Sequence, residues 1–177
     1  MKRFFTTKRL CRAGIISALY VAFTYAFMPF AFGPIQVRPA EALCILPLFF
    51  PEAVPALYVG CMLSNLASPY LVYDVFIGSL ATLLAALCTY LVGNYIQKEN
   101  ARFFVGGVFP VLFNSFFIPL IIVFLCDGIA GFNSATAAYF SYALSLFLTE
   151  CLWVYGLGAP LYFSVLRLKK RNLSLFE

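Results

Sequence analysis

The sequence predicts an all-α protein: an integral membrane bundle of six transmembrane helices with its N-terminus and C-terminus in the cytoplasm. Three observations predict this fold class. Hydrophobic residues fill 63% of the 177 positions and charged residues only 11%, whereas soluble domains carry roughly 45–50% apolar and about 25% charged residues. Several apolar runs approach or exceed the ~20 residues that a spanning helix needs. Basic residues also gather beside the ends of these runs.

The expected helices belong to one membrane domain, residues 1–177. The first apolar run is too long for the 7–15-residue core of a signal peptide, so we expect a retained helix there. The next stretch, 38–67, contains four prolines, and proline interrupts helices, so it forms either one kinked span or two shorter ones. In order, the expected helices cover residues 13–32, 39–50, 52–67, 74–96, 103–126 and 134–166.

Charge favours two helices within 38–67. With six spans, the basic N-terminus, the loop at 98–102 and the basic C-terminal segment all lie on the cytoplasmic side, as the positive-inside rule requires. With five spans they cannot share that side. Arg38, Asp74 and Asp127 then lie at or near the outer face. Residues 40–50 are short for a full crossing, so a re-entrant hairpin is an alternative for that segment.

Composition and motifs exclude several functions. The net charge is +5, but eleven of the twelve Lys and Arg residues flank apolar runs, which indicates membrane anchoring and no nucleic-acid partner. The chain contains no GxxxxGK[ST] phosphate-binding loop and no histidine, and its six cysteines are scattered. We therefore expect no catalytic residues, no metal ligands and no cofactor in this chain.

Three polar residues in apolar helices are candidates for a substrate site. Glu150 lies 17 residues before Arg167, which is about 25 Å along a helix and in the outer half of a core about 30 Å thick. Asn114 lies 12 residues after Arg102, about 18 Å from the inner end, and Asn65 is near the outer end of its helix. Because polar side chains facing lipid are costly, we expect all three to line one outward-facing cavity.

The last helix places aromatic side chains beside Glu150. Tyr139, Tyr142, Leu146, Glu150 and Trp153 follow a spacing of three or four residues, which puts them on one helix face. A carboxylate among aromatic rings suits a flat heterocycle, because the rings stack and the carboxylate accepts N–H donors or offsets a cation. The alternative is that Glu150 hydrogen-bonds to neighbouring helices and the aromatic rings form core.

Two further features concern the first helix and the loop after it. Arg38 follows a turn rich in glycine and proline, so it either caps the cavity or forms an ion pair with Glu41. Small residues recur every fourth position in the first helix, which allows another helix to approach closely. This strip is either a docking face for a partner chain or internal packing, and it consists of Gly14, Ala18, Ala22 and Ala26.

Two long segments carry a family resemblance. QVRPAEALCILPLFFPEAVPALYVGCMLSNL (36–66), followed by YDVFIGSLATLLAAL (73–87), resembles the QueT-type membrane proteins. These are substrate-binding subunits (S components) of energy-coupling factor (ECF) transporters for queuosine precursors. The short segment ALYVA (18–22) is similar to the alanine motif with which S components meet their coupling subunit.

The resemblance implies a multi-pass protein of the bacterial plasma membrane. It would capture a deazaguanine-type base outside the cell, under the loop at 33–38, and dock on the transmembrane coupling subunit EcfT. Two ABC-type ATPase subunits would then supply the ATP hydrolysis. Alternatives are an S component for riboflavin, thiamine, biotin or folate, an autonomous secondary carrier, and an intramembrane enzyme.

Overall fold

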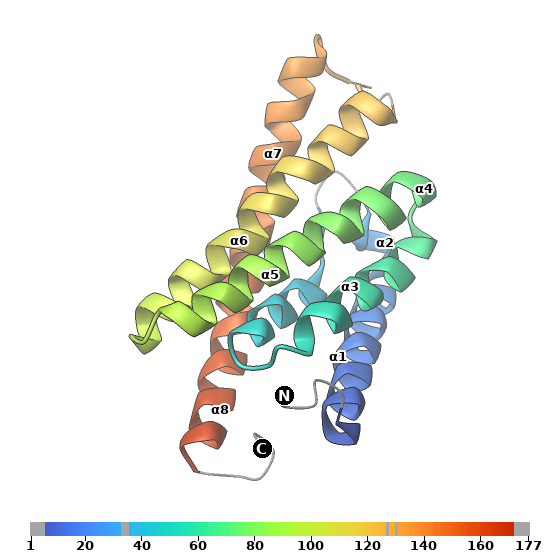
Figure 1. The fold of residues 1–177 in the computed structure, drawn as a ribbon. Coiled ribbons are helices and arrows are strands. Elements are labelled where there is room, and N and C mark those ends of the chain that lie inside the picture. Colours follow the sequence, from blue (N-terminus) through green and yellow to red (C-terminus); the bar gives the residue numbers. More distant parts are fainter. Residues whose placement is uncertain (1–5, 33–35, 127, 130, 172–177) are drawn as a thin grey trace.

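The computed structural model describes residues 6–32, 36–126, 128–129 and 131–171. Every regular element in these residues is helical, which confirms the all-α prediction (Figure 1). Residues 33–35 of the expected capping loop, and Asp127, expected near the outer face, lie outside the described part. The α-helices are α1 (Thr7–Ala26), α2 (Met28–Ala31), α3 (Ala53–Ser64), α4 (Leu71–Tyr73), α5 (Ser79–Tyr95), α6 (Glu99–Leu120), α7 (Ala135–Cys151) and α8 (Gly158–Lys170).

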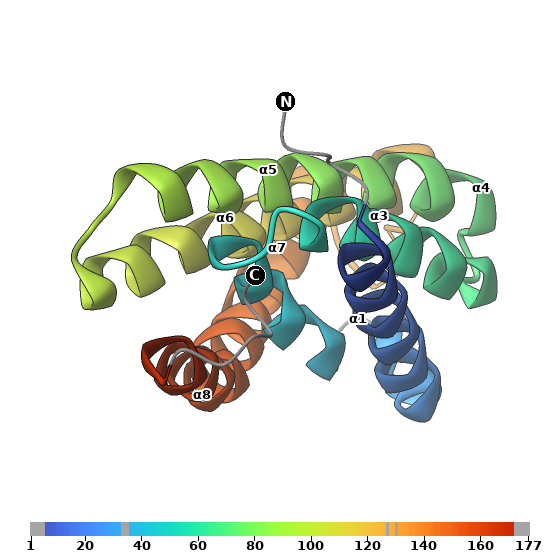
Figure 2. The same cartoon turned by 60° about the horizontal axis from the view of Figure 1, so that its bottom comes forward.

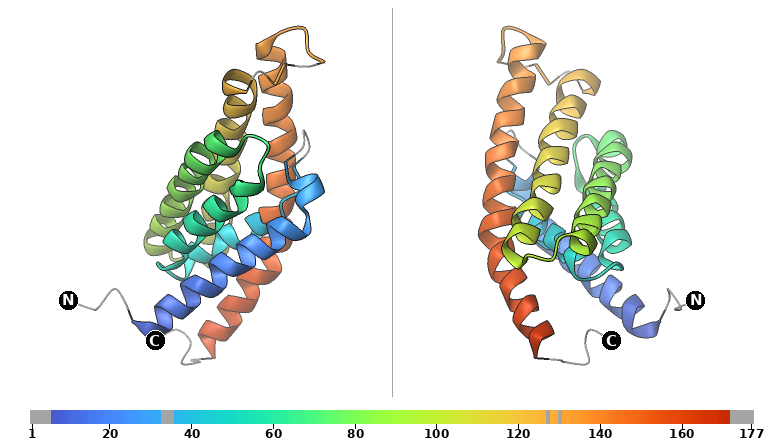
Figure 3. Two further views of the ribbon diagram at one scale, coloured as in Figure 1. Left: turned by 90° about the vertical axis from the view of Figure 1, so that its right-hand side faces the viewer. Right: turned by 60° about the vertical axis from the view of Figure 1, so that its left-hand side comes forward.

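Tighter and wider helical turns connect or extend these helices. The 3₁₀ helices are η1 (Pro39–Leu48) and η2 (Asn65–Ala67). The π-helical segments of the described chain are η3 (Asp74–Gly78), η4 (Ile121–Leu125) and η5 (Leu152–Leu157). The last of these joins α7 to α8, so the two helices form one long rod (Figure 3).

Three helical stretches of the described chain are long and apolar enough to cross a membrane. They are Leu71–Tyr95, Glu99–Leu125 and Ala135–Lys170, and they correspond to the expected helices at 74–96, 103–126 and 134–166. The other three expected segments form helices that are shorter or less apolar. The six-span arrangement and the side of the membrane on which the termini lie therefore remain predictions.

The first helix differs from its expected bounds of 13–32. It begins at Thr7, within the basic segment, and ends at Ala26. The short helix α2 follows, with Pro29 in its first turn. Proline is tolerated there because the first N–H groups of a helix have no intrahelical partner, but within a continuous helix it would remove a hydrogen bond.

The segment η1 lies inside the bundle. All ten of its residues, Pro39–Leu48, are buried, and it packs against α1, α3, α5, α6 and α8. In Figure 2 it occupies the space between α1 and α8. At about 2.0 Å per residue a ten-residue 3₁₀ helix is roughly 20 Å long, which is too short for a full crossing of a core about 30 Å thick.

Two glycines let η1 approach the helix pair α5–α6. A Cβ atom added to Gly93 would lie 2.8 Å from the carbonyl oxygen of Leu48, and one added to Gly106 would lie 2.7 Å from a methyl carbon of Leu48. A side chain at Gly93 would collide with the backbone of η1, whereas one at Gly106 would displace the Leu48 side chain. The end of η1 is thereby in close contact with both α5 and α6.

The basic ends of the helices gather in the lower half of both views in Figure 3. Two ion pairs join neighbouring elements in this region. Arg12 Nη1 lies 3.1 Å from Glu52 Oε1, which links α1 to the start of α3, and Lys170 Nζ lies 2.8 Å from Glu99 Oε1, which links α8 to α6. This grouping agrees with the distribution of charge from which the orientation was predicted.

Candidate functional site

A buried polar network is centred on Arg38, which directly precedes η1. The Arg38 side chain is 5% exposed. Its Nη2 atom donates to Asn65 Oδ1 at 3.2 Å and to the Tyr20 hydroxyl at 3.4 Å. Its Nε atom lies 3.8 Å from Glu41 Oε1, so the ion pair considered from the sequence is present. Arg38 thereby joins α1, η1 and the end of α3.

Glu41 has partners for both of its carboxylate oxygens. The Tyr20 hydroxyl donates to Oε1 at 2.6 Å, and Cys44 Sγ donates to Oε2 at 3.1 Å. Tyr20 and Glu41 are both fully buried. Tyr20 is not among the site residues predicted from the sequence. A signal was available, because a tyrosine in the middle of an apolar helix needs a partner for its hydroxyl when it is buried.

Asn65 extends the network toward α5. Its Nδ2 atom donates to the backbone carbonyl of Asp74 at 2.8 Å, where the π-helical segment η3 begins. The Asp74 carboxylate in turn accepts a hydrogen bond from Ser68 Oγ at 2.5 Å. Asn65 therefore bridges the Arg38 side chain and the start of the first long apolar stretch.

Glu150 and Asn114 form a second buried pair. Asn114 Nδ2 on α6 donates to Glu150 Oε1 on α7 at 2.9 Å, and each side chain is 2% exposed. Glu150 Oε2 is also buried and has no hydrogen-bond partner within the described chain. Arg38 and Glu41 are close enough to interact electrostatically with Glu150. The structure therefore pairs Glu150 with Asn114 and Arg38 with Asn65, and these two pairs make up the polar region.

The predicted aromatic residues are distributed differently. Tyr139 packs against α6, where its hydroxyl donates to the Phe116 carbonyl at 3.4 Å. Tyr142 contacts the Phe132 ring, with 5.6 Å between centroids, and joins a small apolar cluster. These are packing contacts of the kind that the alternative reading expected. Trp153 lies in η5 and is half-buried, and its indole N–H has no partner in the described residues.

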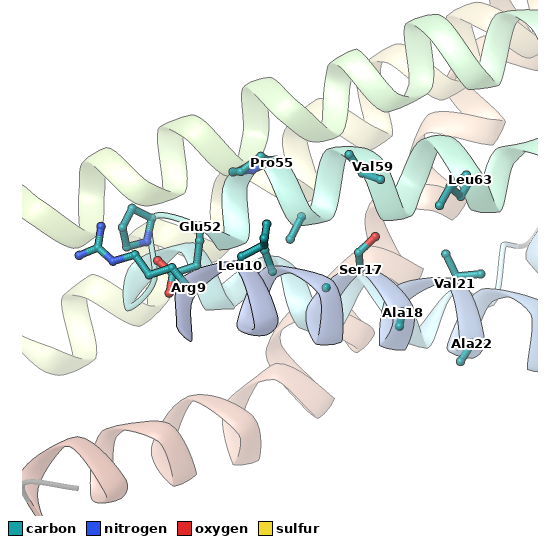
Figure 4. A pocket seen from close by; sticks show the side chains of 14 residues that line it. Arg9, Leu10, Ser17, Ala18, Val21, Ala22, Glu52, Pro55, Val59 and Leu63 are labelled. Atoms are coloured by element: carbon teal, nitrogen blue, oxygen red, sulfur yellow. The ribbon is translucent and has the colours of Figure 1, made fainter. Parts of the chain in front are cut away.

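The small-residue strip of α1 faces outward. Gly14, Ala18, Ala22 and Ala26 are exposed, while the residues of α1 packed inward are Ile16, Tyr20 and Thr24. Gly14, Ala18 and Ala22 line a groove of about 910 Å³ between α1 and α3 (Figure 4). Ala26 is not among the lining residues. A Cβ atom at Gly14 would meet nothing within 4 Å, so no other part of the described chain packs closely against the strip at this residue.

Comparison with known proteins gives the family. No solved structure matches this chain. In the described residues no group of three or more His, Cys, Asp or Glu side chains could hold a metal ion. A curated relative, the queuosine precursor transporter QueT of Lactococcus lactis subsp. cremoris (strain MG1363), is 31% identical over 104 residues, which make up 54% of this chain. The match spans 61% of that relative's length. The model of the QueT transporter family matches residues 10–167, and this chain therefore belongs to the QueT transporter family.

Proposed function

We propose that this chain is the substrate-binding membrane subunit, or S component, of an ECF-type ATP-driven importer. It captures a queuosine precursor, a deazaguanine base, from outside the cell. Family membership supports transport, and the Lactococcus relative, a queuosine precursor transporter, supports the substrate class. The observation that carries the proposal is the buried polar region, in which one oxygen of Glu150 has no hydrogen-bond partner among the described residues.

The buried polar atoms that have no hydrogen-bond partner in the described chain suit a flat, polar heterocycle. Buried polar atoms in proteins are nearly always hydrogen-bonded, so those left over mark positions where a ligand can bind. Glu150 Oε2 and Gln36 Oε1 are acceptors and Trp153 Nε1 is a donor, and no partner for them occurs in the described chain. A deazaguanine base offers N–H donors on its guanine-like edge and accepts through its ring oxygen and nitrogen atoms.

Asn114 has a positioning role in this proposal. Its amide holds Glu150 Oε1 at 2.9 Å, which fixes the carboxylate and leaves Oε2 directed to the ligand. Arg38 and Asn65 bound the same region and are fixed by their own hydrogen bonds. A site whose polar groups are held in place before binding loses less entropy when the ligand arrives.

Energy coupling belongs to partner chains in this proposal. The groove along Gly14, Ala18 and Ala22 is the surface that receives a helix of EcfT, because small residues allow close helix contact and the strip is exposed in this chain. Two ABC-type ATPase subunits drive EcfT. The location is the bacterial plasma membrane.

Ligand titration of the purified protein tests the substrate class. Isothermal calorimetry would compare a deazaguanine base with riboflavin, thiamine, biotin and folate. We expect binding of the deazaguanine alone. Binding of a vitamin without binding of the deazaguanine would overturn the substrate assignment.

Uptake into liposomes tests the coupling. We expect no net uptake by this chain alone, and ATP-dependent uptake after addition of the coupling subunit with its two ATPases. Uptake by the isolated chain would instead show an autonomous carrier.

A further inference from the structure

The groove between α1 and α3 is charged at one end and apolar along most of its length. Its volume is about 910 Å³, within the range of pockets that hold small molecules. Figure 4 shows Arg9 and Glu52 at one end of the groove and Val21 and Leu63 toward the other. Apart from Ser17, the other residues that line it in the described chain are apolar. The groove therefore matches an amphiphile, with a charged headgroup followed by an apolar chain.

The length of the groove suits one leaflet of a bilayer. Arg9 and Ala22 both line it and are 13 residues apart on α1, which is about 20 Å at a rise of 1.5 Å per residue. One leaflet contributes about half of a hydrocarbon core about 30 Å thick. An acyl chain whose headgroup lies beside Arg9 would therefore contact the groove through the whole depth of that leaflet.

The positive charges at the basic end are not balanced by the described chain. Lys8 and Arg9 lie in the first turn of α1, which contains no acidic residue. The N-terminus of a helix carries a partial positive charge and favours anions, so cations at this position are unfavourable. Glu52, the acid at this end of the groove, is paired with Arg12 at 3.1 Å. Neither Lys8 nor Arg9 forms an ion pair with another described residue.

Arg9 is the basic residue placed to bind an anion in the groove. Arg12 is held by Glu52 and by the Phe50 ring, whose centre lies 4.8 Å from its guanidinium carbon. Arg9 is half-buried and lines the groove. The positive-inside rule accounts for basic residues on this side of the bundle, but not for an unpaired one at the end of an apolar groove. A guanidinium binds phosphate oxygens through two parallel hydrogen bonds.

We propose that the groove between α1 and α3 binds an anionic phospholipid, with its phosphate at Arg9 and one acyl chain along the apolar part. Large exposed apolar surfaces mark interaction sites, and the cytoplasmic leaflet of a membrane carries anionic lipids. The lipid fills the surface on which EcfT docks and is displaced when EcfT arrives. This displacement rests on the proposed function, whereas the binding of the lipid does not.

Native mass spectrometry of the delipidated protein in detergent tests lipid binding. The probes are dioleoyl-phosphatidylglycerol, which is anionic, and dioleoyl-phosphatidylcholine, which has the same chains and no net charge. One basic residue near the membrane surface strengthens the binding of anionic lipid about fivefold. We therefore expect the tightest site to prefer phosphatidylglycerol about fivefold or more. Equal affinities for the two lipids would overturn the proposal.

Two matched variants test the position of the headgroup. We expect Arg9→Gln to lower the affinity for phosphatidylglycerol about fivefold and to leave that for phosphatidylcholine unchanged. Arg167→Gln, the control, removes an exposed basic residue of α8 that does not line the groove, and it should keep the wild-type affinities. An equal loss in both variants, or no loss in Arg9→Gln, would overturn the role of Arg9.

A second pair of variants tests the position of the acyl chain. Val59 lines the groove from α3 and is 39% exposed, so Val59→Trp places a large ring in the space of the chain. We expect the tightest site to be lost for both lipids. Val105→Trp, at an equally exposed residue of α6 outside the groove, is the control and should keep that site. Retention of the site in Val59→Trp would overturn the groove as its location.

Assembly with the coupling subunit in nanodiscs tests the displacement. We expect the wild-type protein to bind EcfT with its ATPases about fivefold more weakly in phosphatidylglycerol than in phosphatidylcholine, and Arg9→Gln to remove this difference. Equal assembly of the wild-type protein in both lipids would overturn the displacement and leave the lipid site intact. Absence of assembly in either lipid would overturn the coupling function proposed above.

Discussion

Removal of one hydroxyl group from the buried network should measurably destabilise the protein. Tyr20→Phe deletes the group that donates to Glu41 Oε1 at 2.6 Å and accepts from Arg38 at 3.4 Å. The Glu41 oxygen then keeps only the distant Nε of Arg38, at 3.8 Å. Because this bond ties α1 to the buried segment η1, its loss should loosen the contact between them.

The expected cost follows from the charge on the acceptor. A hydrogen bond to a charged group contributes about 1.5–3 kcal/mol to the free energy of unfolding. For a chain of this size, that corresponds to a fall of roughly 3–12 °C in Tm. Thermal unfolding of the detergent-purified protein, followed by circular dichroism, would measure it.

A control and a double-mutant cycle make this prediction specific. Tyr25→Phe alters an exposed tyrosine of the same helix and should change the free energy of unfolding by no more than about 0.5 kcal/mol. Combining Tyr20→Phe with Glu41→Gln should cost less than the sum of the two single changes, because the residues share one interaction. Strict additivity, or a Tm for Tyr20→Phe equal to that of the control, would refute the role given to this hydrogen bond.

Two further predictions concern the outer groove and the tight contact of η1. Ala18→Trp and Ala22→Trp should abolish co-purification with EcfT and leave ligand affinity unchanged. Leu19→Trp, exposed on the same helix but outside the groove, is the control and should keep both co-purification and ligand affinity; loss of ligand binding in the first two variants would instead indicate internal packing. Gly93→Val should lower the free energy of unfolding by about 1–3 kcal/mol or more, measured by thermal unfolding, because its Cβ would collide with the backbone of η1. Gly156→Val, where a Cβ meets only an ordinary contact at 3.8 Å, is the control, and an equal effect of both substitutions would contradict this account.

The sequence predicted those parts of the site that depend on helix geometry. Asn114 and Glu150 lie in long apolar helices, and a rise of 1.5 Å per residue placed them about 18 Å and about 25 Å from the inner ends of these helices. The structure shows them in contact. The all-α class followed equally directly, from a composition that leaves too few polar residues to cover a soluble domain.

The network around Glu41 could not be predicted in the same way. Glu41 lies in a 3₁₀ segment with proline at its start and again near its end, where the 3.6-residue period no longer tells which side chains face inward. Its partner Tyr20 lies in α1, before that segment, and Asn65, which accepts from Arg38 in the same network, follows α3, after it. Only the tertiary path of η1 brings them together.

The length of the rod formed by α7, η5 and α8 has a consequence for how the protein sits in a lipid bilayer. Its 36 residues extend about 54 Å at a helical rise of 1.5 Å each, well beyond a hydrocarbon layer of about 30 Å. At a tilt of 40° from the membrane normal, the upper end of the usual range, the length of the rod along the normal is still about 41 Å. This length is close to the full bilayer thickness including the lipid headgroups. The last turn of α8, with Arg167, Lys169 and Lys170, is then carried to the level of the lipid phosphates, which would resist vertical sliding of the helix.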